Sequence, residues 1–155
     1  MVGEIDAKLK ALGIDLPAPG KPAANYVPYV VTGNLLFISG QVPMTPDGVK
    51  FVGKLGREFS VEEGQQAARL CAINVLGIAK AAVGDLEKIR RIVKVVGFVN
   101  ATPDFVDAHK VINGASDLIT EVLGDQRGKH ARSAIGMGTL PLGVAVEVEA
   151  IAEIG

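Results

Sequence analysis

The sequence predicts one α+β domain in which strands and helices follow the order β-β-β-α-β-α-β-β, behind an extra N-terminal helix. Three observations support this prediction. Two runs of high β propensity flank Gly33-Asn34, a helix-capping motif begins at Ser60, and the last third of the chain is strand-like again. We expect the two later helices to pack together on one face of one sheet, unlike the helices of a doubly wound fold.

The N-terminal region is expected to form a short helix and a stiff connector. Apolar residues recur on one helical face across residues 4–12, and Gly13 follows as a stop signal. Residues 16–22 contain three prolines, which exclude regular structure. We therefore divide the chain into residues 1–25, the helix and connector, and residues 26–155, a single domain.

The domain is expected to open with a β-hairpin. Residues 26–32 are rich in tyrosine and valine, and residues 35–39 form a second run of high β propensity. The Gly33-Asn34 pair between them is typical of a tight hairpin turn. Residues 49–53 are expected to add a third, short strand.

A long helix and a buried strand should follow. Ser60-Val61-Glu62-Glu63 matches a capping box, in which the serine hydroxyl and the second glutamate satisfy backbone N–H groups at the start of a helix. The helix should run to about Val83 and end at Gly84. Residues 89–100 form a continuous β-branched run, which is typical of a strand buried on both faces or nearly so.

The second helix and the last two strands complete the expected order. Thr102-Pro103 should begin the helix, with threonine as cap and proline in the first turn, and Gly124 should end it. Residues 131–138 and 144–154 are expected to be strands on either side of a turn at residues 139–143.

Composition excludes several classes of protein. A chain of 155 residues with 48% hydrophobic and 21% charged residues can bury a core, and no run approaches the roughly 18 apolar residues of a membrane span. The net charge of −1 argues against nucleic-acid binding, since the run Lys88-Arg90-Arg91-Lys94 fits the solvated edge of a strand. The single cysteine, Cys71, fits a buried position in a reducing, cytoplasmic compartment.

The sequence offers no pattern for a metal or an organic cofactor, and we expect neither. His109 and His130 are far apart and lack cysteine or carboxylate partners at metal-binding spacing. Gly136-Met137-Gly138 resembles the start of a phosphate-binding loop, but no helix follows it. A β-bulge or a close backbone approach explains these glycines better.

Arg132 and the acidic residues of the last strand are the remaining candidates for chemistry. A guanidinium within an apolar strand needs an anion, because an unpaired buried cation is costly. Spacing alone favours an internal salt bridge to Glu147 or Glu149 over a bidentate contact with a substrate carboxylate. If residues 138 and 144 pair across a hairpin, Arg132 faces Ala150 and Glu147 points to the opposite side of the sheet.

Several motifs in the correct order resemble the Rid (YjgF-type) reactive-intermediate deaminases, which are often labelled endoribonuclease L-PSP. They are Ile38-Ser39-Gly40-Gln41-Val42-Pro43, Ala131-Arg132-Ser133, Leu140-Pro141 and residues 146–152 (VEVEAIA). The resemblance runs from about Tyr26 to the C-terminus. It implies a fold like that of the trimeric bacterial chorismate mutase, and a cytoplasmic homotrimer with a small pocket at each subunit interface.

The resemblance also implies roles for individual residues. Arg132 corresponds to the arginine that holds the substrate carboxylate, and Glu147 to the acid that orients the attacking water. The positions that correspond to other pocket residues are Ser39, Gly40, Asn113, Ala134 and Tyr29, with Tyr26 as the alternative to Tyr29. Ala134 stands where many members carry a cysteine, the segment before Arg132 is longer than in short members, and these lack the N-terminal helix. The chain therefore resembles a divergent, longer subgroup.

The implied activity is metabolite repair by a hydrolase: reactive 2-imino and 2-enamino acids become 2-keto acids and ammonia, without a cofactor. Arg132 would fix the substrate and Glu147 would handle the proton. Two alternatives stay open. One is a non-catalytic protein that binds small carboxylates or regulates through them on the same trimer. The other is an RNA-cleaving or translation-inhibiting protein, against which the charge balance counts.

Overall fold

A computed structural model describes residues 3–21 and 24–155. Helices and strands lie in the following order: α1 Glu4–Ala11, β1 Tyr29–Thr32, β2 Leu35–Gln41, β3 Met44–Thr45, β4 Gly48–Val49, α2 Val61–Val83, β5 Ile89–Asn100, α3 Ala108–Gly128, β6 Ala131–Met137 and β7 Val146–Ile154. Single 3₁₀ turns lie at Leu86–Lys88 and Pro141–Gly143. The expected α+β class and the strand–helix order after residue 60 are confirmed.

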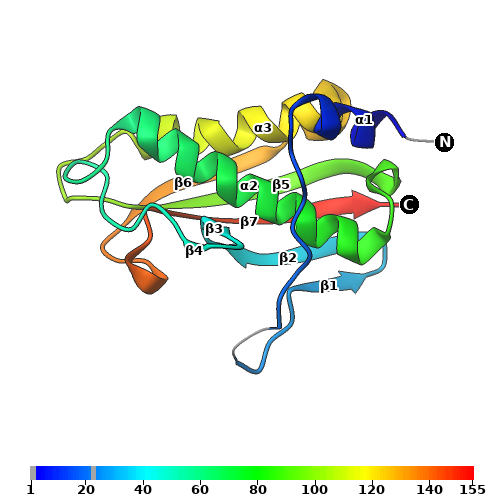
Figure 1. Cartoon of the computed structure of the whole chain (residues 1–155), viewed down its shortest axis with the longest axis horizontal. Helices are drawn as coiled ribbons and strands as arrows, with labels where there is room; N and C mark the ends of the chain where they lie inside the picture. Colours follow the sequence, from blue (N-terminus) through cyan, green and yellow to red (C-terminus); the bar gives the residue numbers. More distant parts are fainter. Residues whose placement is uncertain (1–2, 22–23) are drawn as a thin grey trace.

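The main sheet has the strand order β1-β2-β7-β5-β6, and α2 and α3 pack against each other on one of its faces (Figure 1). All neighbouring strands are antiparallel except β5 and β6, which are parallel. The core between helices and sheet is aliphatic, and its largest fully buried side chains include Leu36, Leu76, Ile92, Ile112, Val95 and Val99. The opposite face of the sheet carries no helix among the residues that the structure describes.

The predicted hairpin and first long helix are confirmed. Strands β1 and β2 pair from Thr32↔Leu35 outward, although β1 begins at Tyr29 and not at residue 26. At the start of α2, the Glu63 N–H donates to Ser60 Oγ at 3.2 Å and the Ser60 N–H donates to Glu63 Oε1 at 3.0 Å. Gly84 ends the helix with φ 81°, a left-handed conformation that favours glycine.

Helix α2 is long and apolar enough to cross a membrane by length and composition, but more than half of its most apolar stretch is buried within the protein. Cys71 lies in this helix, is fully buried as expected, and donates from Sγ to the Val146 carbonyl at 3.5 Å. The helix also approaches α3 closely, since a Cβ at Gly114 of α3 would collide with the backbone of Gln65. Burial against both α3 and the sheet makes α2 the central helix of the core.

Two predicted elements near the middle of the chain are wrong. Residues 49–53 do not form the third strand; β3 and β4 pair around residues 46–47 instead, and Val52 makes only an isolated bridge to Val144. The second long helix does not begin at Thr102-Pro103, but at Ala108. The Thr102 N–H donates to the Leu55 carbonyl at 3.1 Å, which keeps this segment extended, and the Thr102 hydroxyl caps no helix.

Three further expectations need correction. Gly124 interrupts α3 with φ 82° and ψ 165°, but another helical turn follows it up to Gly128. Gly136 and Gly138 mark neither a bulge nor a close approach, because β6 pairs regularly with β5 and no atom lies within 4 Å of where their Cβ atoms would stand. Strand β5 is buried only on its helix side, since its other face is partly exposed.

The N-terminal helix is part of the same core. Ile5 and Leu9 of α1 and Ile14, which follows the helix, are buried in the hydrophobic core. The Ile5 N–H at the start of α1 donates to Glu87 Oε1 at 2.9 Å. Arg127 forms an ion pair with the other carboxylate oxygen of Glu87 at 2.8 Å. These two contacts lower the pKa of Glu87, the N–H of Ile5 being the stronger cause. The connector then runs across α2 towards the β1 edge, as Figure 1 shows.

Candidate functional site

Arg132 lies in the edge strand β6, and its side chain is bound along α3. Nη1 donates to Asn113 Oδ1 at 2.9 Å and to Ser116 Oγ at 3.2 Å, and Nη2 donates to the His109 carbonyl at 3.1 Å. Residues 109, 113 and 116 follow one another at helical spacing, so they present one polar stripe to the guanidinium. Register places Arg132 beside Val95 of β5, on the face of the sheet that α3 covers.

The expected salt bridge between Arg132 and Glu147 or Glu149 is absent from the described residues, where every hydrogen-bond partner of the guanidinium is a neutral oxygen. These contacts use three of its five N–H groups. The remaining two belong to Nε and Nη2, adjacent nitrogens of one planar group. A carboxylate binds such a pair bidentately. Arg132 is therefore a fixed, partly buried cation that forms no ion pair with the residues that the structure describes.

Glu147 lies on the other side of the sheet. It pairs with Phe98 in the register of β7 and β5, whereas Arg132 aligns through Val95 with Ala150. Burial raises the pKa of Glu147, and repulsion from Glu149 raises it further. The carboxylate also lies against Gly40, where a Cβ would collide with it. Within one chain the sheet separates the only two residues expected to be catalytic.

Ser39 and Gly40 are on the same side as Glu147, at a break in the register between β2 and β7. They line a hollow of about 650 Å³ together with Tyr26, Asn74 and the connector residues 17–21. The Ser39 hydroxyl donates to the Val27 carbonyl at 2.7 Å. Tyr29 pairs with Ile38 and packs against the core, whereas Tyr26, the alternative tyrosine, lines the hollow.

The predicted site residues thus fall into two groups. Asn113 lies beside Arg132, and Ala134 follows two positions later on β6, partly buried against the core. Sequence reasoning did not single out Ser116, the His109 carbonyl or His130 as parts of the arginine site. The helical spacing of His109, Asn113 and Ser116 was the pattern that could have revealed the first two.

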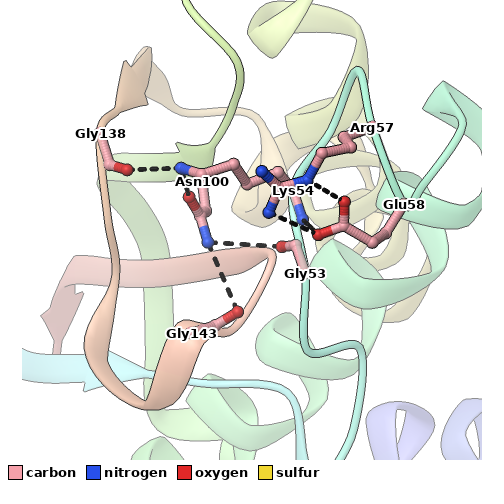
Figure 2. A network of polar contacts seen from close by, with 7 residues as sticks. All are labelled: Gly53, Lys54, Arg57, Glu58, Asn100, Gly138 and Gly143. Atoms are coloured by element: carbon pink, nitrogen blue, oxygen red, sulfur yellow. Dashed lines mark hydrogen bonds and ion pairs between the residues drawn. The ribbon is translucent and has the colours of Figure 1, made fainter.

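A second polar cluster fastens the loop after β4 to the far end of the sheet (Figure 2). Lys54 Nζ donates to Asn100 Oδ1 at 2.7 Å and to the Gly138 carbonyl. Asn100, which is 4% exposed, donates in turn to the carbonyls of Gly53 and Gly143. The Lys54 ammonium and the Asn100 amide both form hydrogen bonds within the protein, so the role of the cluster is to join three chain segments.

The structure offers no further candidate site, either as a metal centre in the described residues or in a second groove beside α1. The described residues contain no group of three or more histidine, cysteine, aspartate or glutamate side chains placed to hold a metal ion. A groove of about 700 Å³ lies between α1, the connector and α2. It is lined by none of the predicted site residues, and its charged residues include the Lys80–Asp6 ion pair.

Comparison with known proteins identifies relatives over nearly the whole chain. The chain is 49% identical over 152 residues to protein TCP17 of Trypanosoma cruzi, covering 98% of this chain and 95% of that protein. It is 32% identical over 138 residues to the putative reactive intermediate deaminase TdcF of Escherichia coli, covering 87% and 90%.

Solved structures agree with these relatives. The Agrobacterium tumefaciens protein Atu1372, of unknown function, superposes with a TM-score of 0.91 at 50% identity, covering 98% of this chain and 94% of that one. A putative endoribonuclease from Shewanella oneidensis gives a TM-score of 0.93 at 32% identity, covering 98% and 100%. TdcF of E. coli, solved with bound serine, gives 0.61 at 30% identity, covering 89% and 94%.

The family and the fold expected from the sequence motifs are confirmed. A family model described as YjgF/chorismate mutase-like, putative endoribonuclease, matches residues 6–154. The match includes most of α1 and the connector as well as the main sheet and its two covering helices. The chain therefore belongs to the YjgF/chorismate mutase-like family.

Proposed function

We propose that the chain catalyses the hydrolytic deamination of reactive 2-imino and 2-enamino acids, in pockets between the subunits of a cytoplasmic homotrimer. The observation that carries this proposal is Arg132, a fixed cation whose hydrogen bonds to residues 3–21 and 24–155 all go to neutral oxygens. Such a group binds an external carboxylate without first breaking an internal ion pair. The serine bound to TdcF, an amino acid with a carboxylate, supports a ligand of this class.

Glu147 suits the proton transfers of this reaction. The carboxylate accepts a proton from a water molecule as the water oxygen adds to the carbon of the C=N bond. Glu147 then returns this proton to the nitrogen, which gives a carbinolamine. The proton of the carbinolamine hydroxyl next passes to the nitrogen through Glu147, the C–N bond breaks, ammonia leaves, and the carbonyl of the 2-keto acid forms. Burial and Glu149 raise the pKa of Glu147, which moves it towards the working pH of a general acid–base. Atoms balance with water as the only co-reactant, so no cofactor is needed.

The separation of Arg132 and Glu147 supports a site shared by two subunits. Arg132 lies on the face of the sheet that α3 covers, and Glu147 lies on the opposite face. A pocket that contains both residues therefore needs Arg132 from one copy and Glu147 from another. Ser39 and Gly40 lie at the bulge in β2, where the Glu147 carboxylate approaches Gly40, and we infer that they contact the substrate there together with Tyr29 or its alternative, Tyr26. Asn113 and Ala134 would border the pocket from the Arg132 side.

Two variants test the proposal. Arg132→Ala should abolish binding of pyruvate, because the pocket loses its fixed guanidinium. Glu147→Gln should preserve pyruvate binding and lower the turnover of freshly generated iminopyruvate by about a hundredfold, a typical loss for a general base. Titration calorimetry and a coupled ammonia assay measure the two effects, with Glu121→Gln on the exposed side of α3 as the control.

The same measurements separate the alternatives. Pyruvate binding by the wild-type chain without turnover would favour a carboxylate-binding or regulatory protein over an enzyme. Cleavage of RNA, together with retention on RNA that weakens as salt rises, would favour the ribonuclease alternative. Absence of both pyruvate binding and turnover in the wild-type chain would overturn the proposal.

A further inference from the structure

His130 is fixed by two hydrogen bonds at the junction between α3 and β6. Its Nδ1 lies 2.6 Å from the Gly128 carbonyl, and its Nε2 lies 2.9 Å from Ser116 Oγ. A carbonyl oxygen only accepts hydrogen bonds, so Nδ1 must carry a proton. In the neutral ring, Nε2 is then the acceptor, and the Ser116 hydroxyl donates to it.

This orientation determines what the serine oxygen can do for Arg132. With its proton directed at His130, Ser116 Oγ offers lone pairs to Arg132 Nη1, 3.2 Å away. Burial lowers the pKa of His130, and the nearby charge of Arg132 lowers it too, against the opposing effect of the Gly128 carbonyl. The neutral ring is therefore the favoured form, and the hydrogen bonds run in one direction from Arg132 through Ser116 to His130.

We propose that His130 and Ser116 are positioning residues for Arg132, and that they hold its guanidinium so that the N–H groups of Nε and Nη2 meet the substrate carboxylate. This inference rests on the proposed function. A free arginine side chain has many rotamers, and each acceptor on α3 removes part of that freedom before the ligand arrives. Neither residue touches the reacting carbon, so their effect should fall on binding and not on the chemical step.

The test compares three variants with wild type. Ser116→Ala and His130→Ala should each weaken pyruvate binding and raise the KM for iminopyruvate by about tenfold, with kcat changed by less than about twofold. His130→Gln should restore most of the affinity, because its side-chain oxygen can accept from Ser116 near the position of Nε2. Thr120→Ala is the matched control: it deletes a hydroxyl one turn along α3 that bonds only helix carbonyls.

Nuclear magnetic resonance of the ligand-free protein provides a readout that is independent of activity. The ¹⁵N shifts of His130 should report the Nδ1–H tautomer, and the Nη1 protons of Arg132 should exchange faster in Ser116→Ala and His130→Ala than in wild type. An Nε2–H tautomer, or variants with unchanged exchange and unchanged KM, would overturn the inference. If wild type binds no pyruvate while these signals are as expected, the proposed function fails and the positioning of Arg132 stands.

Discussion

The surroundings of Arg132 explain how a strand residue can stay charged when no carboxylate of the described part of the chain pairs with it. Three neutral oxygens of α3 take up three N–H groups and orient the plane of the guanidinium. A carboxylate in the same place would neutralise the charge and compete with any ligand. The pattern of neutral acceptors is thus typical of a cation kept for an external anion.

Glu147 illustrates the opposite situation, a carboxylate whose ionisation is opposed by its environment. Its pKa in the folded chain is raised, by burial first and by Glu149 second. The folded state therefore binds the proton more tightly than the unfolded state, and the resulting stabilisation is complete only below the unfolded pKa of about 4.3. As pH rises through the folded pKa, this stabilisation is lost.

Glu147→Gln should consequently raise the melting temperature at pH 7, where glutamine removes an unfavourable charge, and the gain should shrink towards pH 4. Thermal denaturation at the two pH values measures this, with Glu121→Gln as the exposed control. A buried salt bridge predicts the opposite sign at pH 7, because it would leave an unpaired partner. A lower melting temperature for Glu147→Gln at pH 7 would contradict the pKa argument.

The positions of Arg132 and Glu147 relative to the sheet could be predicted from sequence, although the strand pairing assumed for the argument was different. A hairpin closed by residues 138 and 144 would place Arg132 opposite Ala150. In the structure β5 lies between β6 and β7, and register aligns Arg132, Val95 and Ala150 in one row. Inserting a strand in register keeps the same residues on the same face. The stripe on α3 was not predicted, because it depends on how a helix packs across the sheet edge.

At the scale of elements, local chemistry predicted the structure where no distant contact competed with it. The capping box at Ser60 and the Gly33-Asn34 turn involve only near neighbours, and both are present. The predicted helix start at Thr102-Pro103 is wrong because the backbone of Thr102 bonds to Leu55, and a local sequence pattern does not reveal such a distant contact. Strands β3 and β4 have only two residues each, too few to show alternation, although Pro46-Asp47-Gly48 is a turn signal.

The cluster around Asn100 shows how such distant contacts hold the elements together. One buried amide joins the end of β5 to the loop at Gly53 and to the connection that precedes β7 (Figure 2). It also accepts from Lys54. Removing this side chain leaves carbonyls and an ammonium group without their partners, which costs more than the loss of one surface hydrogen bond.

Asn100→Ala should therefore lower the free energy of unfolding by about 2–4 kcal/mol, whereas Asn34→Ala, at an exposed turn, should change it by less than about 0.5 kcal/mol. Urea denaturation with unchanged m-values measures both. Lys54→Met provides a second check, since it removes the ammonium and should recover part of the loss in the double variant. Equal, small effects of Asn100→Ala and Asn34→Ala would show that the cluster does not join these segments.

At the scale of the whole molecule, the face of the sheet opposite α2 and α3 is notable for its exposed apolar side chains. Val30, Phe37 and Ile135 lie on this face with exposed fractions of 51%, 40% and 44%, beside the acidic residues of β7. Apolar side chains gathered on one face mark an interaction surface, and in a closed symmetric assembly each copy would cover the next. Such an assembly would also bring the Glu147 side of one copy within reach of another copy's Arg132.

Mixing two impaired variants tests the assembly and the shared site together. Arg132→Ala and Glu147→Gln each lack one half of every pocket, so each variant alone should show at most about a hundredth of the wild-type turnover. After unfolding and refolding as an equal mixture, a pocket is complete only where the Arg132 side comes from a Glu147→Gln subunit and the Glu147 side from an Arg132→Ala subunit. Random assembly gives this combination in about a quarter of the pockets, so about a quarter of the wild-type turnover should return.

Light scattering should give a trimer mass, and Ile135→Asp, which places a charge on the open face, should give monomers without turnover. A monomer mass for wild type, or no recovery from a mixture that forms trimers, would rule out a pocket built from Arg132 and Glu147 of different copies.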